Sequence, residues 1–154
     1  MSLQSYFPTL IYRSRPAIPP TLLTQLQTES YQFKKLDNVG RKWSTQNYPE
    51  GYTSYSSVAQ LHKQSPTFAR LARVLDKEAK KYAQSLEFDF AQGKLELSTL
   101  WINIMGPHST HAFHLHPLSA ISGTFYVATP KDSGALKVED PRIMGFMGSP
   151  PRKL

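Results

Sequence analysis

The sequence contains no cysteine, which excludes disulfide bonds, thiolate metal sites and a cysteine nucleophile. It has no apolar run long enough for a transmembrane helix, and its first residues lack the basic and apolar regions of a secretory signal. With 40% hydrophobic and 19% charged residues, the 154-residue chain has the composition of one globular domain and not of a disordered segment. These absences predict a cytoplasmic protein with no membrane contact.

Acidic residues are scarce beside basic ones, 11 against 18, which gives a net charge of +7. Residues 1–80 hold 11 Lys/Arg and 5 Asp/Glu, so most of the excess lies there. Such a positive potential suits an anionic substrate or a nucleic acid. Because the sequence has no run of like charge, no RGG tract and no known nucleic-acid motif, it disfavours a dedicated nucleic-acid role. A weak contact through the N-terminal helices stays open as an alternative.

Residues 1–93 are predicted to form a supporting region of helices and short strands. Ser5–Tyr12, interrupted by Pro8, is typical of a short edge strand. Thr21 is the expected N-cap of a first helix. Residues 39–57 are rich in Gly, Ser, Thr and Tyr, which favours loop with short strand pieces.

A stronger helix signal follows, because Ser65 is a good N-cap and Pro66 suits the first helical position. The residues behind it place apolar side chains at helical spacing, which predicts a surface helix packed on a sheet. The apolar stripe comprises Phe68, Leu71, Ala72, Leu75, Ala79, Tyr82, Ala83 and Leu86. The remaining faces carry basic residues that are expected to be solvated, namely Arg70, Arg73, Lys77, Lys80 and Lys81.

Residues 94–154 change to β character and carry the candidate chemistry. The predicted strands are Leu95–Met105, Ala112–His116, Ile121–Ala128 and Ala135–Glu139, separated by Gly and Pro. Alternation places Leu100, Ile102 and Ile104 on one face of the first strand, and Leu95, Leu97, Trp101, Asn103 and Met105 on the other. Helices followed by several strands predict an α+β chain, a helix-backed β-sandwich in one single domain.

Four of the five histidines lie within nine residues: His108, His111, His114 and His116. A tract this dense is typical of metal binding. On a strand, His114 and His116 would point to the same face, at a spacing that lets two imidazoles meet one ion. Imidazole binds Fe, Zn, Cu and Ni alike, so the ligand type does not select the metal. A polar loop with solvated histidines is the alternative.

Two further polar groups belong to neighbouring strand faces. Asn103 interrupts an apolar face, so its amide either ties down a loop or faces a ligand. Tyr126 shares a strand face with Ser122 and Thr124. If the two strands line one cavity, metal ligands and anion-binding donors converge there.

Several motifs occur in order and together resemble a known family. They are Trp43-Ser44, Gly51-Tyr52-Thr53-Ser54-Tyr55, Trp101-Ile-Asn103-Ile-Met105, His114-Leu-His116-Pro117-Leu-Ser119-x-x-Ser122-Gly123-Thr124-x-Tyr126-Val127 and Glu139-Asp140-Pro141-Arg142. From about residue 40 onward the chain resembles Fe(II)/2-oxoglutarate-dependent oxygenases of bacteria and their phages. The resemblance implies a double-stranded β-helix, or jelly-roll, core. It also implies Fe(II) as cofactor and 2-oxoglutarate as cosubstrate for a hydroxylase of unknown small-molecule or protein substrate.

By position, the resemblance makes His114 the first metal ligand. His116 falls where most members carry a carboxylate, which implies either a three-His site or a carboxylate from elsewhere. Asn103 and Tyr126 correspond to residues that bind the cosubstrate, and no catalytic residue beyond the metal ligands is implied. Glu139 and Asp140 are either a stray carboxylate ligand or, preferably, a loop end before Pro141.

Members of this family continue beyond the Glu139–Arg142 segment with strands that supply a distal His and a distal Arg or Lys. No histidine follows His116 here, so the chain resembles a member with a shortened C-terminal part and an inactive site. Without late strands, sheet edges would stay open, which predicts marginal stability or a homo-oligomer formed by edge pairing. The alternative function is a non-catalytic jelly-roll remnant or a binding module that associates through its exposed sheet.

Overall fold

The computed structural model describes residues 2, 4–5 and 8–139, and the chain divides into two units. One unit is Ser14–Thr129, and the other combines Met1–Arg13 with Pro130–Leu154. In the second unit the described residues have no helix or strand. The predicted edge strand at Ser5–Tyr12 is therefore wrong for residues 5 and 8–12, and the predicted strand Ala135–Glu139 is also wrong.

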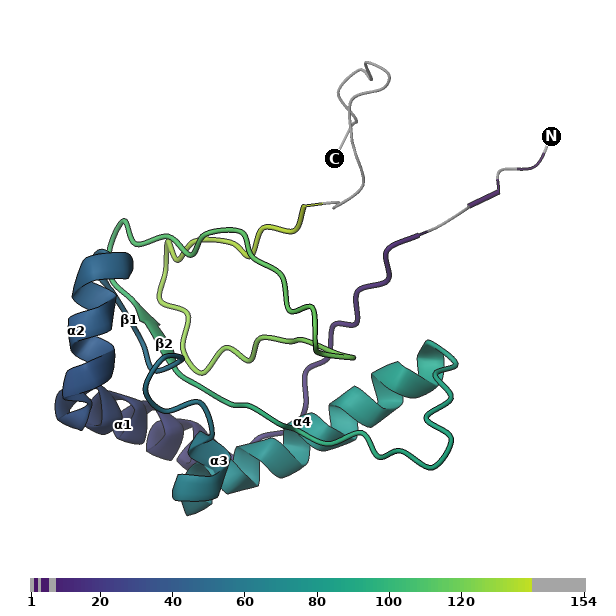
Figure 1. The fold of residues 1–154 in the computed structure, drawn as a ribbon, viewed down its shortest axis with the longest axis horizontal. Coiled ribbons are helices and arrows are strands. Elements are labelled where there is room, and N and C mark those ends of the chain that lie inside the picture. Colours follow the sequence, from purple (N-terminus) through teal and green to yellow (C-terminus); the bar gives the residue numbers. More distant parts are fainter. Residues whose placement is uncertain (1, 3, 6–7, 140–154) are drawn as a thin grey trace. The chain divides into compact units, whose positions relative to one another are not determined.

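The unit of residues 14–129 contains four helices and two short strands among its residues (Figure 1). In chain order they are α1 (Pro20–Leu36), α2 (Asn38–Asn47), β1 (Gly51–Thr53), α3 (Leu61–Gln64), α4 (Pro66–Ser85) and β2 (Asn103–Met105). The α+β prediction is confirmed as a mixture of helices with a two-stranded antiparallel sheet. A jelly roll is not what the structure shows. No helix in the described part of the chain combines the length and apolar character that crossing a membrane requires.

Helix α1 begins at Pro20, which occupies the first helical position, and no side chain caps it. The prediction that Thr21 is the N-cap is wrong, because the fixed φ of Pro20 suits the first helical position and the helix starts two residues earlier, with Pro19 as N-cap. The inner face of α1 buries Leu22 and Leu26. On the same face the buried Ser30 hydroxyl donates to the Leu26 carbonyl at 2.7 Å.

Helix α2 replaces the first half of the loop predicted over residues 39–57. Asp37 caps it by accepting a hydrogen bond from the Gly40 amide at 2.8 Å. The two buried residues of α2 are Gly40 and Ser44, both small. Its packing face therefore has no apolar periodicity, which is why the sequence pattern does not indicate a helix there.

Helix α4 begins as the sequence predicts. The Ser65 hydroxyl accepts hydrogen bonds from the Thr67 amide at 3.1 Å and the Phe68 amide at 3.4 Å, with Pro66 in the first turn. The Glu29 carboxylate on α1 accepts hydrogen bonds from the Ser65 and Thr67 hydroxyls. An anion at a helix N-terminus is favourable, so Glu29 joins α1 to the start of α4.

The chain turns back after α4 and runs along this helix to β2 (Figure 1). On the way the Leu97 amide donates to the Asp76 carboxylate of α4 at 3.0 Å. Strand β2 then pairs antiparallel with β1, placing Gly51 opposite Met105 and Thr53 opposite Asn103. Only Asn103–Met105 of the predicted strand Leu95–Met105 is a strand, with a single further bridge between Leu100 and Gln60 among the described residues.

Ser54 extends this pairing by side-chain hydrogen bonds. It is fully buried, its amide donates to the Ile102 carbonyl at 3.0 Å, and its hydroxyl accepts from the Ile102 amide at 3.1 Å. The same hydroxyl donates to the Val58 carbonyl at 3.0 Å. The Ser54 hydroxyl thus gives the Ile102 amide a hydrogen-bond partner next to the end of the β1–β2 pairing.

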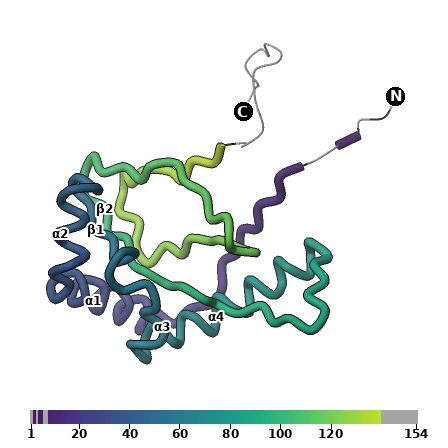
Figure 2. Tube along the Cα trace, in the orientation of Figure 1, coloured from purple at the N-terminus to yellow at the C-terminus, as the bar shows by residue number. Residues whose placement is uncertain are grey.

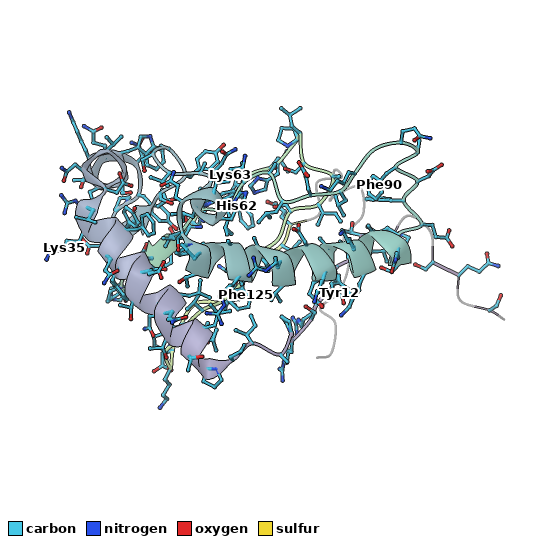
Figure 3. The ribbon with its side chains drawn as sticks, turned by 90° about the horizontal axis from the view of Figure 1, so that it is seen from below. Tyr12, Lys35, His62, Lys63, Phe90 and Phe125 are labelled. Atoms are coloured by element: carbon cyan, nitrogen blue, oxygen red, sulfur yellow. The ribbon has the colours of Figure 1, made fainter. Side chains whose placement is uncertain are left out.

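The core lies between α1, α4 and the β1–β2 ribbon. Its buried side chains form one cluster, comprising Leu22, Leu26, Tyr52, Leu61, Phe68, Leu71 and Ile102. Phe125 and Val127 pack against this cluster from the segment that follows β2, and Figure 3 shows Phe125 beside α4. The predicted alternation is confirmed for Leu100, Ile102 and Ile104: Ile102 belongs to the core cluster, and Leu100 and Ile104 pack against it.

Residues 106–129 form a long irregular excursion (Figure 2). The predicted strands Ala112–His116 and Ile121–Ala128 are therefore wrong as hydrogen-bonded strands. Their apolar residues lack a second sheet to pair with, and Phe113 and Leu115 remain exposed.

Candidate metal centre

The histidine tract begins immediately after β2, at a tight connection to β1. The Gly106 amide donates to the Glu50 carbonyl at 2.8 Å, and a Cβ at Gly106 would lie 2.2 Å from that oxygen. Only glycine therefore allows this approach. His108 follows in a left-handed conformation with φ of 62°.

His114 and His116 meet through their ring nitrogens, as the sequence predicts for this pair. Their Nε2 atoms are 3.1 Å apart, and the His114 Nδ1 lies 2.9 Å from the Ala112 carbonyl oxygen. A carbonyl only accepts, so His114 Nδ1 carries the proton and its Nε2 presents a lone pair. In metal sites, the ring nitrogen of a histidine that does not bind the metal usually donates its proton to a carboxylate, a backbone carbonyl or water.

The separation of the two nitrogens also fits one ion. Two nitrogens 3.1 Å apart, each about 2.1 Å from an ion, subtend an angle of about 95°. That angle suits adjacent ligands of a metal. Among the described residues, however, no group of three or more His, Cys, Asp or Glu side chains is placed to hold a metal ion. The described part of the chain therefore offers two imidazoles at this point and no third ligand.

Other aromatic rings pack against the histidine pair on both of its sides. On one side, the rings of His111 and His114 are stacked with centroids 4.7 Å apart, and the Tyr48 ring lies 5.1 Å from that of His111. On the other side, Trp101 lies 5.9 Å from His116, and Tyr55 lies 5.0 Å from Trp101. The stacked geometry turns the His111 ring parallel to His114, so its nitrogens do not converge with the pair.

Burial shifts the pKa values of two neighbouring side chains, His111 and Tyr48. Burial lowers the pKa of His111, and the neighbouring His114 and His116 lower it further. Burial raises the pKa of Tyr48, whose hydroxyl is in contact with the Met105 sulfur. Both shifts favour the uncharged form, and an uncharged imidazole is the form that binds metals.

Asn103 and Tyr126, the two predicted cosubstrate residues, are both exposed. Asn103 lies on β2 on the same side as Trp101, opposite the core. Tyr126 is 52% exposed and lies between two residues that pack on the core, Phe125 and Val127. In the described part of the chain neither side chain hydrogen-bonds to His114 or His116, so the structure brings the two histidines together without these partners.

The remaining candidates lie apart from the pair or outside the described residues. His62 lies on α3 with its Nδ1 buried and without a hydrogen-bond partner, and burial lowers its pKa, as does Lys63. Glu139 is exposed, without regular structure. Asp140 and the rest of the Glu139–Arg142 motif lie outside the described residues.

One family model matches part of the chain. Residues 99–154 match the profile of a family named, provisionally, 2OG-Fe(II) oxygenase. The match covers just over a third of the chain and includes Trp101, the histidine tract and Tyr126. Among curated proteins, none matches this chain.

Sequence reasoning assigned no role to the rings beside the histidine pair. Tyr48 and Tyr55 flank β1, Trp101 precedes β2, and Met105 is its last residue. The register that pairs Gly51 with Met105 carries Tyr48 to one end of the ribbon and Tyr55 to the other. The clustering of aromatic residues on either side of β1 is the signal that could have indicated them.

Proposed function

We propose that this chain is part of a non-haem Fe(II)/2-oxoglutarate-dependent dioxygenase that hydroxylates an unknown substrate. The observation that carries the proposal is the His114–His116 pair, whose Nε2 atoms are 3.1 Å apart inside the region that matches the oxygenase family. When bound, Fe(II) and 2-oxoglutarate supply the oxidising chemistry for hydroxylation by O2.

His114 and His116 are the metal ligands in this proposal. The Ala112 carbonyl holds the His114 tautomer, and the stacked His111 ring restricts rotation of the same imidazole. A carboxylate or a third imidazole would complete the site. Asn103 and Tyr126 provide an amide and a hydroxyl that would hydrogen-bond the 2-oxoglutarate carboxylates.

The jelly-roll core belongs to this proposal too. Residues 113–116 and 125–127 keep the alternation of a strand, since His114 and His116 meet while Phe113 and Leu115 stay exposed. Likewise Phe125 and Val127 face the core while Tyr126 faces out. Further strands pairing with these segments would give the exposed apolar side chains a partner sheet.

The two tryptophans of the chain allow a direct binding test. Trp101 lies 5.9 Å from His116, so a paramagnetic ion held by the histidines should quench its fluorescence. In a Trp43→Phe background Trp101 is the sole tryptophan. We expect anaerobic Fe(II) to quench it, and His114→Ala or His116→Ala to weaken the apparent affinity by about tenfold or more. Asn103→Ala and Tyr126→Phe should weaken 2-oxoglutarate binding, measured by the visible charge-transfer band.

His108→Asn is the matched control, because Asn tolerates the left-handed backbone of His108. It should leave the Fe(II) affinity unchanged. Quenching that persists in both His114→Ala and His116→Ala would place the metal elsewhere and refute the ligand assignment. A folded protein that neither binds Fe(II) nor releases succinate from 2-oxoglutarate would refute the enzyme.

A further inference from the structure

The exposed face of α4 is composed of cations. From Thr67 to Lys80 the exposed residues of this helix are Arg70, Arg73, Lys77 and Lys80, while every other residue is buried or half-buried. Their spacing of three, four and three residues places them in one row along the helix. The sequence has no run of like charge because the helix, not the linear order, gathers these residues.

The salt bridges of the described residues do not include this row. The Asp76 carboxylate is half-buried and accepts the Leu97 amide at 3.0 Å. The Glu78 carboxylate lies 2.6 Å from the Lys81 ammonium, beside the row. Arg70 is oriented by a hydrogen bond of 3.1 Å to the Gln25 side-chain oxygen of α1.

A shallow groove runs next to the row. It encloses about 480 Å³ between the extended segment Arg15–Ala17 and α4, and its lining includes Arg15, Lys77 and the Glu78–Lys81 pair. Arg15 thus adds a cation on the opposite wall from Lys77. Pro16 favours an extended backbone at Arg15.

The dimensions of the row match a linear polyanion. From Arg70 to Lys80 the helix rises about 15 Å, and one strand of a nucleic acid presents a phosphate about every 3.4 Å of axis, so the row faces about four phosphates. We propose that this face of α4, with Arg15, binds the phosphodiester backbone of a nucleic acid without reading its bases.

The opposite face of α4 argues against a lipid surface as the ligand. Its apolar side chains, including Phe68, Leu71 and Ala72, are buried in the core. An amphipathic helix that lies on a membrane inserts such a face among the lipids. In α4 that face is already occupied, so the row offers charge alone, which a phosphodiester chain fits without apolar contact.

The test is equilibrium binding of the full chain to fluorescent random-sequence duplex DNA and to oligo-dT of equal length, by anisotropy over a range of KCl. For five phosphate contacts on duplex DNA, four from the row and one from Arg15, we expect log K against log salt to fall with a slope of about −4.5. The triple variant Arg73→Gln, Lys77→Gln, Lys80→Gln should flatten the slope by about 2.7 and weaken binding by about tenfold or more. Arg15→Gln should flatten it by about 0.9.

The control variant is Lys35→Gln, Lys42→Gln, Lys63→Gln, which removes the same charge from exposed residues outside α4. Lys35 lies on α1 and Lys63 on α3 (Figure 3). It should keep the wild-type slope. Melting temperatures close to that of the unmodified chain verify that both triples fold.

Equal losses in the two triple variants would mean that net charge, and not the row, binds the polyanion, and would overturn the proposal. So would the absence of salt-dependent binding to either DNA. Binding of α4 to anionic vesicles of phosphatidylserine and phosphatidylcholine, with no DNA binding, would assign the row to lipid instead. None of these residues belongs to the histidine pair, so the outcome is independent of the oxygenase proposal.

Discussion

The Asp37 carboxylate accepts hydrogen bonds from three parts of the fold. It caps α2 through the Gly40 amide, accepts the Tyr52 hydroxyl of β1 at 2.8 Å, and accepts the Ser57 hydroxyl of the following loop. Burial alone would raise the pKa of Asp37, but these hydrogen bonds and the nearby Arg41 charge lower it below its usual value. Burial, with the Asp37 hydrogen bond, raises the pKa of Tyr52 in return.

This shift predicts a loss of stability in acid. Because the pKa of Asp37 is lower in the folded state, its ionised form stabilises the fold fully above its unfolded pKa of about 3.9, and this stabilisation is lost as the pH falls through the folded-state pKa. We expect Asp37→Asn to lower the unfolding free energy at neutral pH by about 1–2 kcal/mol and to flatten its decrease below about pH 4. Urea denaturation across this pH range measures both.

Asp132→Asn serves as the control, since this exposed carboxylate lies in a left-handed turn that Asn also tolerates. Its urea midpoints should follow the unmodified protein at every pH. An unchanged acid profile in Asp37→Asn would show that other carboxylates determine acid unfolding.

The histidine pair shows which parts of the candidate site local sequence patterns could predict. The two-residue spacing predicts that His114 and His116 lie on one side of a strand, and their rings do meet, but on irregular backbone. The Ala112 carbonyl that fixes the His114 tautomer is a local contact. The Tyr48–His111 and Tyr55–Trp101 contacts depend on the β1–β2 register, which joins residues about fifty positions apart. No local pattern specifies such a pairing, so the sequence shows aromatic residues on either side of β1 but not which rings they contact.

At the scale of elements, local sequence signals predict α4 but not α2. Helix α4 was predictable because its N-cap, its first-turn proline and its apolar stripe are all local signals. Helix α2 was missed because it packs through Gly40 and Ser44, and the Ser44 hydroxyl accepts the Thr53 amide of β1 at 3.1 Å. Close approach through small residues and side-chain hydrogen bonds leaves no hydrophobic periodicity to read.

Gly40 gives the sharpest test of this packing. A Cβ there would lie 2.0 Å from Asp37 Oδ2 and 2.6 Å from Ser57 Oγ, so alanine must displace the cap of α2. In an unconstrained helix Gly→Ala stabilises by about 1 kcal/mol. We therefore expect the opposite sign here, a loss of about 2 kcal/mol in the free energy of unfolding measured by urea denaturation.

Gly123→Ala is the matched control, because its Cβ would meet nothing within 4 Å. It should leave the urea midpoint nearly unchanged. A stabilised Gly40→Ala variant would contradict the tight contact between α2 and the Asp37–Ser57 pair.

At the scale of the molecule, residues 20–105 and 107–129 differ in the hydrogen bonds and apolar contacts that stabilise them. The first range contains all the described helices and strands and the buried core cluster. In the second range, the described backbone hydrogen bonds are those donated by Ser109 and Ser119, and Phe125 and Val127 pack against the core from outside. A jelly roll depends on pairing between distant strands, whose loop-closure entropy must be offset by contacts that residues 107–129 do not make here.

Hydrogen exchange measures this difference directly. We expect the amides of α4 to exchange slowest, since they are bonded within a helix over the core, and those of residues 107–129 to exchange close to the unprotected rate. If Fe(II) and 2-oxoglutarate bind at His114 and His116, protection should appear around residues 111–118 in the unmodified chain and not in His114→Ala. Strong protection of residues 107–129 before any addition would instead mean that these segments already pair as strands in solution, which would contradict the irregular excursion and support the jelly roll itself.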